Sequence, residues 1–113
     1  MKRILVVGGG LIGIRHLQAV QAHAECELVG LVDLDMSIQC DVARFAKMGD
    51  VLEPVDGVII ATPTHLHTPH GIEAAERGWH MLIEKPVSET LESAQKLEMA
   101  LRGQNIRSLV GHH

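Results

Sequence analysis

The chain has 113 residues, of which 46% are hydrophobic and 21% are charged, and its formal net charge is −4. A chain of this length forms one domain, and its negative charge gives no reason to expect binding to nucleic acid or to an anionic membrane. No apolar run approaches the roughly 18 residues of a membrane span, and glycines interrupt the apolar stretch near the N-terminus. We therefore expect a globular, cytoplasmic protein. Phe45 and Trp79 are the only aromatic residues, so the core must be aliphatic, as in a parallel sheet between helices.

Short apolar runs alternate with amphipathic stretches along the chain, a pattern typical of β-α-β folds. We predict strands over residues 4–7, 28–32, 58–61, 80–83 and 106–110. Helices are predicted over residues 11–24 and 37–48, between Thr68 and Gly78, and between Thr90 and Gly103. The fold class is therefore α/β, an open parallel sheet of about five strands with helices on both faces.

The predicted helices carry apolar stripes and end signals. The stripes are Ile14, Leu17 and Val20; Ile38, Val42 and Phe45, with Gly49 as a stop; and Leu91, Ala94, Leu97 and Leu101. Thr68 is predicted to cap the third helix, with Pro69 at its first position and Gly78 at its end. Glu73 and Arg77 have the i, i+4 spacing of a surface ion pair.

Three glycines follow the first predicted strand. Gly8, Gly10 and Gly13 form the pattern G-x-G-x-x-G between a strand and a helix, which is the context in which this pattern binds a dinucleotide. Gly8 permits the tight turn, Gly10 lets the backbone approach a pyrophosphate, and Gly13 lets the helix pack close to the strand. The amides around Leu11 and Ile12 then face the phosphates at the positive end of the helix dipole. We expect these five residues to bind a cofactor in a Rossmann-like domain that spans residues 1–113.

Asp33 ends the second predicted strand, twenty residues after Gly13. At this position a carboxylate accepts hydrogen bonds from the ribose hydroxyls of the adenosine. It also repels a 2′-phosphate, and Leu34 and Asp35 follow it where an arginine would favour NADP. The pattern therefore predicts NAD in preference to NADP. The alternative is a glycine-rich turn without a ligand beside a surface aspartate.

Two further motifs, Thr62-Pro63 and Glu84-Lys85-Pro86, end the third and fourth predicted strands. Ligands of open parallel sheets bind beyond the carboxyl ends of the strands, so both motifs should lie near the glycine turn. Lys85 at the mouth of an apolar crevice is partly desolvated, which favours its neutral form, whereas Glu84 acts in the opposite direction. A neutral lysine can take up a hydroxyl proton as hydride leaves the neighbouring carbon. The alternative is an ion pair that only holds the turn.

With these residues the chain resembles the N-terminal domain of the Gfo/Idh/MocA oxidoreductases, the family of glucose–fructose oxidoreductase and inositol dehydrogenase. The matching residues are Gly8 to Gly13, Asp33, Ala61-Thr62-Pro63, His67 and Glu84-Lys85-Pro86. The resemblance implies that Thr62, Pro63, His67 and Glu84 contact the cofactor. It implies that Lys85 contacts the cofactor too and is the catalytic group. It also implies hydride transfer with a sugar- or polyol-type substrate.

Two groups of histidines invite other interpretations. His65, His67 and His70 lie within six residues, and imidazoles are good zinc ligands. Because no cysteine or carboxylate joins them in the motif, we predict no metal site. His16 and His23 lie seven residues apart on the first helix, and we expect both at the surface.

Two parts of the family pattern have no counterpart in this sequence. Family members carry a further strand and helix before the strand that matches residues 58–61, where only residues 49–55 are available. We therefore predict an internal deletion after residue 48, a sheet without the usual third strand, and the strand order 2-1-3-4-5 in place of 3-2-1-4-5-6. Helix 37–48 would then cover the face opposite helix 11–24, and NAD would bind more weakly.

The second missing part is the C-terminal substrate domain of the family. We expect a truncated cofactor-binding domain of an NAD-dependent oxidoreductase that binds NAD(H), is weakly active or inactive alone, and meets a sugar or polyol only where a second domain is supplied. The alternatives are a stand-alone nucleotide-binding module without catalysis, a half-enzyme completed by a partner chain, and a relic without a ligand. An uncovered sheet edge and apolar patches predict a homodimer.

Overall fold

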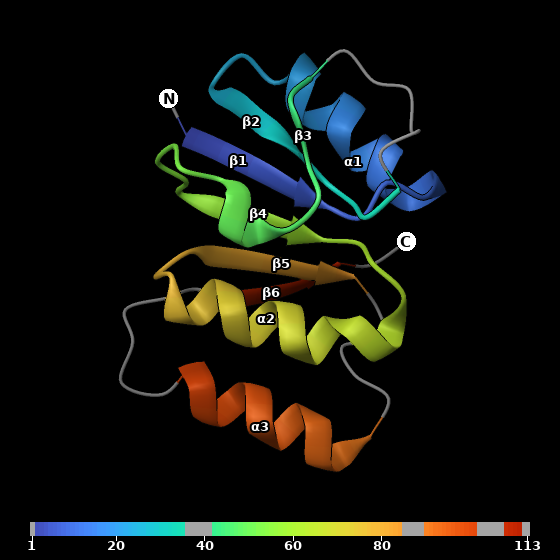
Figure 1. Cartoon of the computed structure of the whole chain (residues 1–113), viewed down its shortest axis with the longest axis vertical. Helices are drawn as coiled ribbons and strands as arrows, with labels where there is room; N and C mark the ends of the chain where they lie inside the picture. The colour runs from blue at the N-terminus through green and yellow to red at the C-terminus, as the bar shows by residue number, and fades with distance from the viewer. Residues whose placement is uncertain (1, 36–41, 85–89, 102–107, 112–113) are drawn as a thin grey trace.

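Six parallel strands form one sheet in the order β3-β2-β1-β4-β5-β6 (Figure 1). The computed structural model describes residues 2–35, 42–84, 90–101 and 108–111. The strands are β1 (Lys2–Val7), β2 (Cys26–Val32), β3 (Arg44–Phe45), β4 (Gly57–Ile60), β5 (His80–Glu84) and β6 (Ser108–Gly111). The helices are α1 (Leu11–Ala22), α2 (His67–Glu76) and α3 (Leu91–Leu101), with short 3-10 turns η1 (Met48–Asp50) and η2 (Thr64–Leu66). No helix among the described residues is both long enough and apolar enough to cross a membrane.

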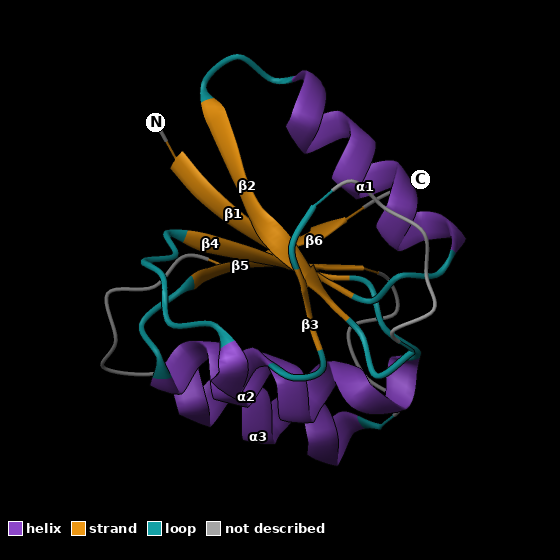
Figure 2. Cartoon of the chain, turned by 45° about the horizontal axis from the view of Figure 1, so that its top comes forward, coloured by secondary structure: helices purple, strands orange, loops and turns teal. Residues whose placement is uncertain are grey.

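Side chains alternate across the sheet, so the central strands contribute to two cores. On one face, Leu5 and Val7 of β1 are fully buried in the larger core, under α2 and α3. On the other face, Val6 packs with Leu17 and Leu31 in a smaller core under α1. Figure 2 shows α1 on one side of the sheet and α2 and α3 on the other. The predicted α/β fold, an open parallel sheet with helices on both faces, is confirmed.

The prediction that the third strand is missing is wrong. Arg44–Phe45 pairs in parallel with the last residues of β2, and the Asp33 N–H donates to the Phe45 carbonyl at 2.9 Å. Addition of this strand gives the order 3-2-1-4-5-6 instead of 2-1-3-4-5. β3 precedes residue 48, so it lies inside the segment that was predicted to be helical, and the strand is not lost.

The predicted helix over residues 37–48 is wrong where the structure describes it, and residues 36–41 lie outside the described residues. Val42 packs against the smaller core and Phe45 against the larger one, so the two side chains do not share a helical stripe. The Phe45 ring lies against Gly30 of β2, where an added Cβ would come within 2.7 Å of the ring. A strand of two residues carries too little alternation to be distinguished from a helix by its periodicity.

The other predicted elements are present, with boundaries within two residues of the prediction. α2 is displaced toward the N-terminus, since it begins at His67, and Thr68 is buried inside the helix instead of capping it. Gly78 ends α2 as predicted. Its φ is +76°, and hydrogen bonds from Gly78 N–H to Ala75 O and from Trp79 N–H to Ala74 O form a Schellman motif. The predicted ion pair between Glu73 and Arg77 is confirmed at 3.1 Å.

Candidate functional site

The glycine turn between β1 and α1 tolerates no side chain at two of its three positions. Gly8 has a φ of +106°, and a Cβ added there would lie 2.7 Å from the backbone carbonyl of Ala61. A Cβ on Gly13 would lie 1.7 Å from the carbonyl oxygen of Gly8. The turn is therefore wedged between the first turn of α1 and the carboxyl end of β4, as the dinucleotide-binding pattern requires.

Gly10 faces open space instead of protein. A Cβ added there would meet nothing within 4 Å, and its φ of −72° is accessible to any residue. The first amides of a helix have no partner inside the helix. Gly10 is the N-cap residue of α1, and no side chain there forms a hydrogen bond with these amides. These amides lie beside an open surface at the positive end of the helix dipole, which suits an anionic group.

Asp33 at the tip of β2 holds the glycine turn in place. Its Oδ2 accepts a hydrogen bond from the Gly9 N–H at 2.7 Å, and its Oδ1 accepts one from the Asp35 N–H at 2.8 Å. A carboxylate has about four acceptor positions, so each oxygen keeps capacity for a ribose hydroxyl. The sequence predicted a ligand role for Asp33 but not this structural one.

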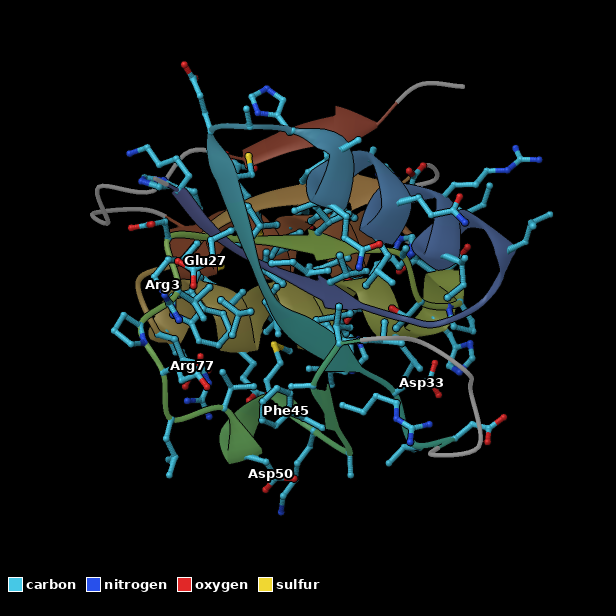
Figure 3. The ribbon with its side chains drawn as sticks, turned by 90° about the horizontal axis from the view of Figure 1, so that it is seen from above. Arg3, Glu27, Asp33, Phe45, Asp50 and Arg77 are labelled. Atoms are coloured by element: carbon cyan, nitrogen blue, oxygen red, sulfur yellow. The ribbon has the colours of Figure 1, made fainter. Side chains whose placement is uncertain are left out.

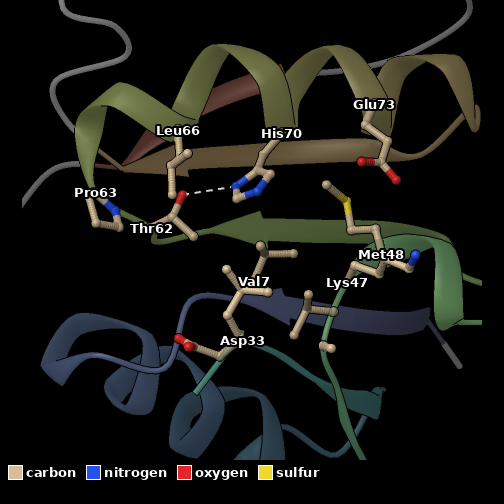
Figure 4. A pocket seen from close by; sticks show the side chains of 12 residues that line it. Val7, Asp33, Lys47, Met48, Thr62, Pro63, Leu66, His70 and Glu73 are labelled. Atoms are coloured by element: carbon tan, nitrogen blue, oxygen red, sulfur yellow. Dashed lines mark hydrogen bonds between the residues drawn. The ribbon is translucent and has the colours of Figure 1, made fainter. Parts of the chain in front are cut away.

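A cavity of about 240 Å³ lies between Asp33 and the start of α2. Figure 4 shows Asp33 and Val7 on one side of it and Thr62, Leu66 and His70 on the other. The remaining lining residues are Val32, Leu34, Ala46, Lys47, Met48, Pro63 and Glu73. The cavity therefore lies at the carboxyl edge of the sheet, and the segment that follows β3 supplies part of its wall.

His70 forms part of the polar lining of this cavity. Its Nδ1 lies 3.2 Å from the Thr62 hydroxyl (Figure 4). Burial lowers the pKa of His70 below its ordinary value, the nearby Glu73 carboxylate raises it, and His67 lowers it further. A neutral ring can accept a hydrogen bond from the Thr62 hydroxyl at Nδ1. Sequence reasoning considered this residue only as a metal ligand and missed its place in the cavity.

His67 lies under the Thr62-Pro63 turn. The residue is 1% exposed, and its Nε2 donates to the Thr62 carbonyl oxygen at 2.6 Å. This hydrogen bond ties the first residue of α2 to the segment that follows β4. The predicted contact between His67 and a cofactor stays a prediction, and the observed contact fixes the turn.

Glu84, the last residue of β5, is 5% exposed. Its Oε1 contacts the Nε2 of His16 from α1. The expectation that His16 is a surface residue is therefore wrong. His16 lies three residues after Gly13 and one before Leu17, on the buried side of α1, and this spacing was the available signal. Lys85 and Pro86 lie outside the described residues.

No three histidine, cysteine or carboxylate side chains within the described ranges are placed to hold a metal ion. The described site residues instead share one edge of the sheet. The glycine turn touches the backbone after β4, Asp33 reaches the turn from β2, and the Thr62 segment borders the same cavity. In fold and in the geometry of this edge, the chain is a Rossmann domain of the dinucleotide-binding class.

Comparison with known proteins identifies the family. The Gfo/Idh/MocA family model, described as "Oxidoreductase family, NAD-binding Rossmann fold", matches residues 2–112. The chain belongs to this family, as the sequence motifs predicted.

Relatives and solved structures agree with this assignment. Glucose-6-phosphate 3-dehydrogenase of Bacillus subtilis is 26% identical over 98% of this chain and 33% of that protein. The rhizopine catabolism protein MocA of Rhizobium meliloti is 33% identical over 83% of this chain and 32% of its own length. The WlbA dehydrogenase from Bordetella pertussis, solved with NADH and UDP-GlcNAcA, superposes with a TM-score of 0.89 at 27% identity and covers 98% of this chain. The chain spans about a third of the length of these relatives.

Proposed function

We propose that this chain is the NAD(H)-binding domain of an oxidoreductase that transfers hydride between the cofactor and a sugar- or polyol-type substrate. The observation that carries the proposal is the glycine turn. Two of its glycines are sterically obligatory, whereas the third leaves the backbone open to an outside group. A turn that served only the fold would have no reason to keep Gly10 free of a side chain.

The chain's own residues divide the work of binding. The amides at the start of α1 would hold the pyrophosphate, and the Asp33 carboxylate would accept hydrogen bonds from the adenosine ribose. Thr62, Pro63, His67 and Glu84 are proposed to extend the site along the same edge of the sheet, and His67 also supports the Thr62 turn through its hydrogen bond. The nicotinamide ring supplies the hydride acceptor or donor.

Asp33 is the basis for a preference for NAD over NADP, since its charge repels a 2′-phosphate. Lys47 lines the same cavity and is a cation that a phosphate there can meet. The replacement Asp33→Asn removes the charge but keeps one acceptor oxygen for the turn. We expect the ratio of the Kd for NADPH to the Kd for NADH to fall at least tenfold, and addition of Lys47→Gln to restore part of it. An unchanged ratio would remove Asp33 from cofactor selection.

Lys85 follows Glu84 in the family motif and is the proposed proton acceptor for the substrate hydroxyl. The substrate pocket is proposed to come from a second domain, so this chain alone should be weakly active or inactive. In a preparation that oxidises a sugar or polyol, Lys85→Met should lower kcat at least about 100-fold, measured at saturating NAD⁺ because Lys85 is also a predicted cofactor contact. Retention of kcat would exclude this role.

A homodimer and a cytoplasmic location stay predictions, and the mass in solution at tens of micromolar tests the first.

The direct test of the proposed function is titration with NADH. Trp79 is the single tryptophan, so energy transfer from its indole to bound NADH reports binding, and NADH fluorescence gives a second signal. We expect saturable binding at or below millimolar NADH that excess NAD⁺ displaces. No change in either signal up to millimolar NADH would contradict the proposal.

A further inference from the structure

The contact between His16 and Glu84 joins two elements that are not neighbours. His16 projects from the second turn of α1, and Glu84 ends β5, which β4 separates from β1. The Glu84 side chain is 7% exposed and that of His16 is 23% exposed. An imidazole ring that carries a proton on Nε2, whether neutral or charged, can donate a hydrogen bond from this nitrogen to the Glu84 carboxylate.

His16 lies at the edge of the buried face of α1, beside the apolar contacts that Leu17 makes. Leu17 packs with Val6 of β1 and Leu31 of β2, with Ile59 of β4 at the border of the cluster. Such a small core holds a helix against two strands but defines its rotation poorly, because apolar contacts are not directional. A hydrogen bond to a buried carboxylate is directional and adds the missing constraint.

The pair also joins two ends of the candidate site. The amides at the start of α1 face the region proposed for the pyrophosphate, and Glu84 is one of the predicted cofactor contacts. We propose that His16 is a positioning residue for dinucleotide binding. Its ring holds α1 in a fixed relation to the tip of β5, so that the helix amides and the β5 tip meet the cofactor together. This inference rests on the proposed function and assigns a role to a residue outside the predicted motif.

The test compares side chains of matched shape at residue 16. His16→Leu removes the donor, His16→Gln keeps an Nε2 donor, and His16→Asn is one methylene too short to reach Glu84. We expect His16→Leu and His16→Asn to bind NADH about tenfold more weakly than the unchanged chain, and His16→Gln to bind within threefold of it. His23→Leu at the exposed end of the same helix is the control and should change nothing.

A second readout separates positioning from general stability. The ³¹P chemical shifts of bound NAD⁺ report the surroundings of the pyrophosphate. If His16 had a purely structural role, its substitution would leave these shifts unchanged. They should differ from those of the unchanged chain in His16→Asn and return in His16→Gln. If His16→Leu does not fold, the Asn and Gln variants carry the comparison.

A double-mutant cycle with Glu84→Leu, which removes the acceptor, completes the test. We expect the effects of His16→Leu and Glu84→Leu on the Kd for NADH to be strongly less than additive, because each removes the same contact. Additive effects, or equal binding by the Asn and Gln variants, would overturn the positioning role and leave the proposed function intact. Failure of the unchanged chain to bind NADH would overturn both.

Discussion

At the amino ends of the strands, long charged side chains link neighbouring strands, whereas at the carboxyl ends the backbone of the glycine turn packs directly against the backbone that follows β4. The Arg3 guanidinium lies 2.9 Å from both Glu27 and Glu53, and the Arg3 N–H donates to Asp56 at 2.8 Å. Figure 3 shows Arg3 and Glu27 together at one end of the molecule and Asp33 at the other. At the Asp33 end, the glycine turn meets β4 through backbone atoms with no space for a methyl group.

The difference shows which edge has a fixed geometry. Exposed ion pairs contribute about 0–1 kcal/mol each and adapt to substitution because their side chains are long. A backbone contact that excludes a Cβ cannot adapt in this way. The carboxyl edge is therefore the part of the molecule whose shape is constrained, in keeping with a ligand site there.

The largest expected effect is that of Gly13→Ala. Its methyl group would lie 1.7 Å from the Gly8 carbonyl oxygen, so the turn and α1 must separate. We expect a loss of at least about 3 kcal/mol in the free energy of unfolding, or no folded protein. Urea unfolding measures it, with Ala19→Gly on the exposed side of α1 as the control, where a loss of about 1 kcal/mol is expected. A fully stable Gly13→Ala variant would refute the wedged turn.

Gly30→Ala tests the strand that sequence reasoning missed. The new Cβ would lie 2.7 Å from both the Ala43 carbonyl oxygen and the Phe45 ring, so β3 must move away from β2. We expect a loss of about 2 kcal/mol. Because β3 leads to Lys47 in the cavity wall, NADH should also bind more weakly. Gly49→Ala, whose Cβ has ordinary contacts, should leave NADH binding unchanged.

Substitution at the amino edge should matter less. Arg3→Gln removes both ion pairs, and we expect a loss of about 1 kcal/mol that shrinks in 1 M salt. NADH affinity should not change. Lys2→Gln removes the same charge from the adjacent exposed position and is the control for net charge. A fall in NADH affinity in Arg3→Gln would show that the two edges are coupled.

The smallest expected effect is a change in pH dependence at His70. Burial lowers the pKa of His70 in the folded state below its ordinary value of about 6.5. The unfolded chain therefore takes up this proton first as the pH falls, and the stability contribution is lost from about pH 6.5 downward toward the lowered pKa. His70→Gln should flatten the pH dependence of unfolding in this window and leave it unchanged above pH 7.5. The exposed His65→Gln is the control, and an unaltered slope in His70→Gln would contradict the assignment.

Much of the carboxyl edge was predictable because its chemistry is local in sequence. The glycine spacing, the strand before it and the position of Asp33 defined the turn, and the apolar runs defined β1, β2, β4, β5 and β6. The missed features depend on contacts across the fold. Gly30 leaves room for the Phe45 ring of β3, His16 meets Glu84 across β4, and Thr68 is buried because α2 starts two residues earlier than predicted.

The central claim is that the first turn of α1 binds a pyrophosphate, and Gly10→Ser tests it most directly. Serine is a preferred helix N-cap, and its side chain has open space at this position. The account predicts a melting temperature equal to or above that of the unchanged chain together with at least tenfold weaker NADH binding. Equal NADH affinity in the two proteins, or no binding by either, would contradict it.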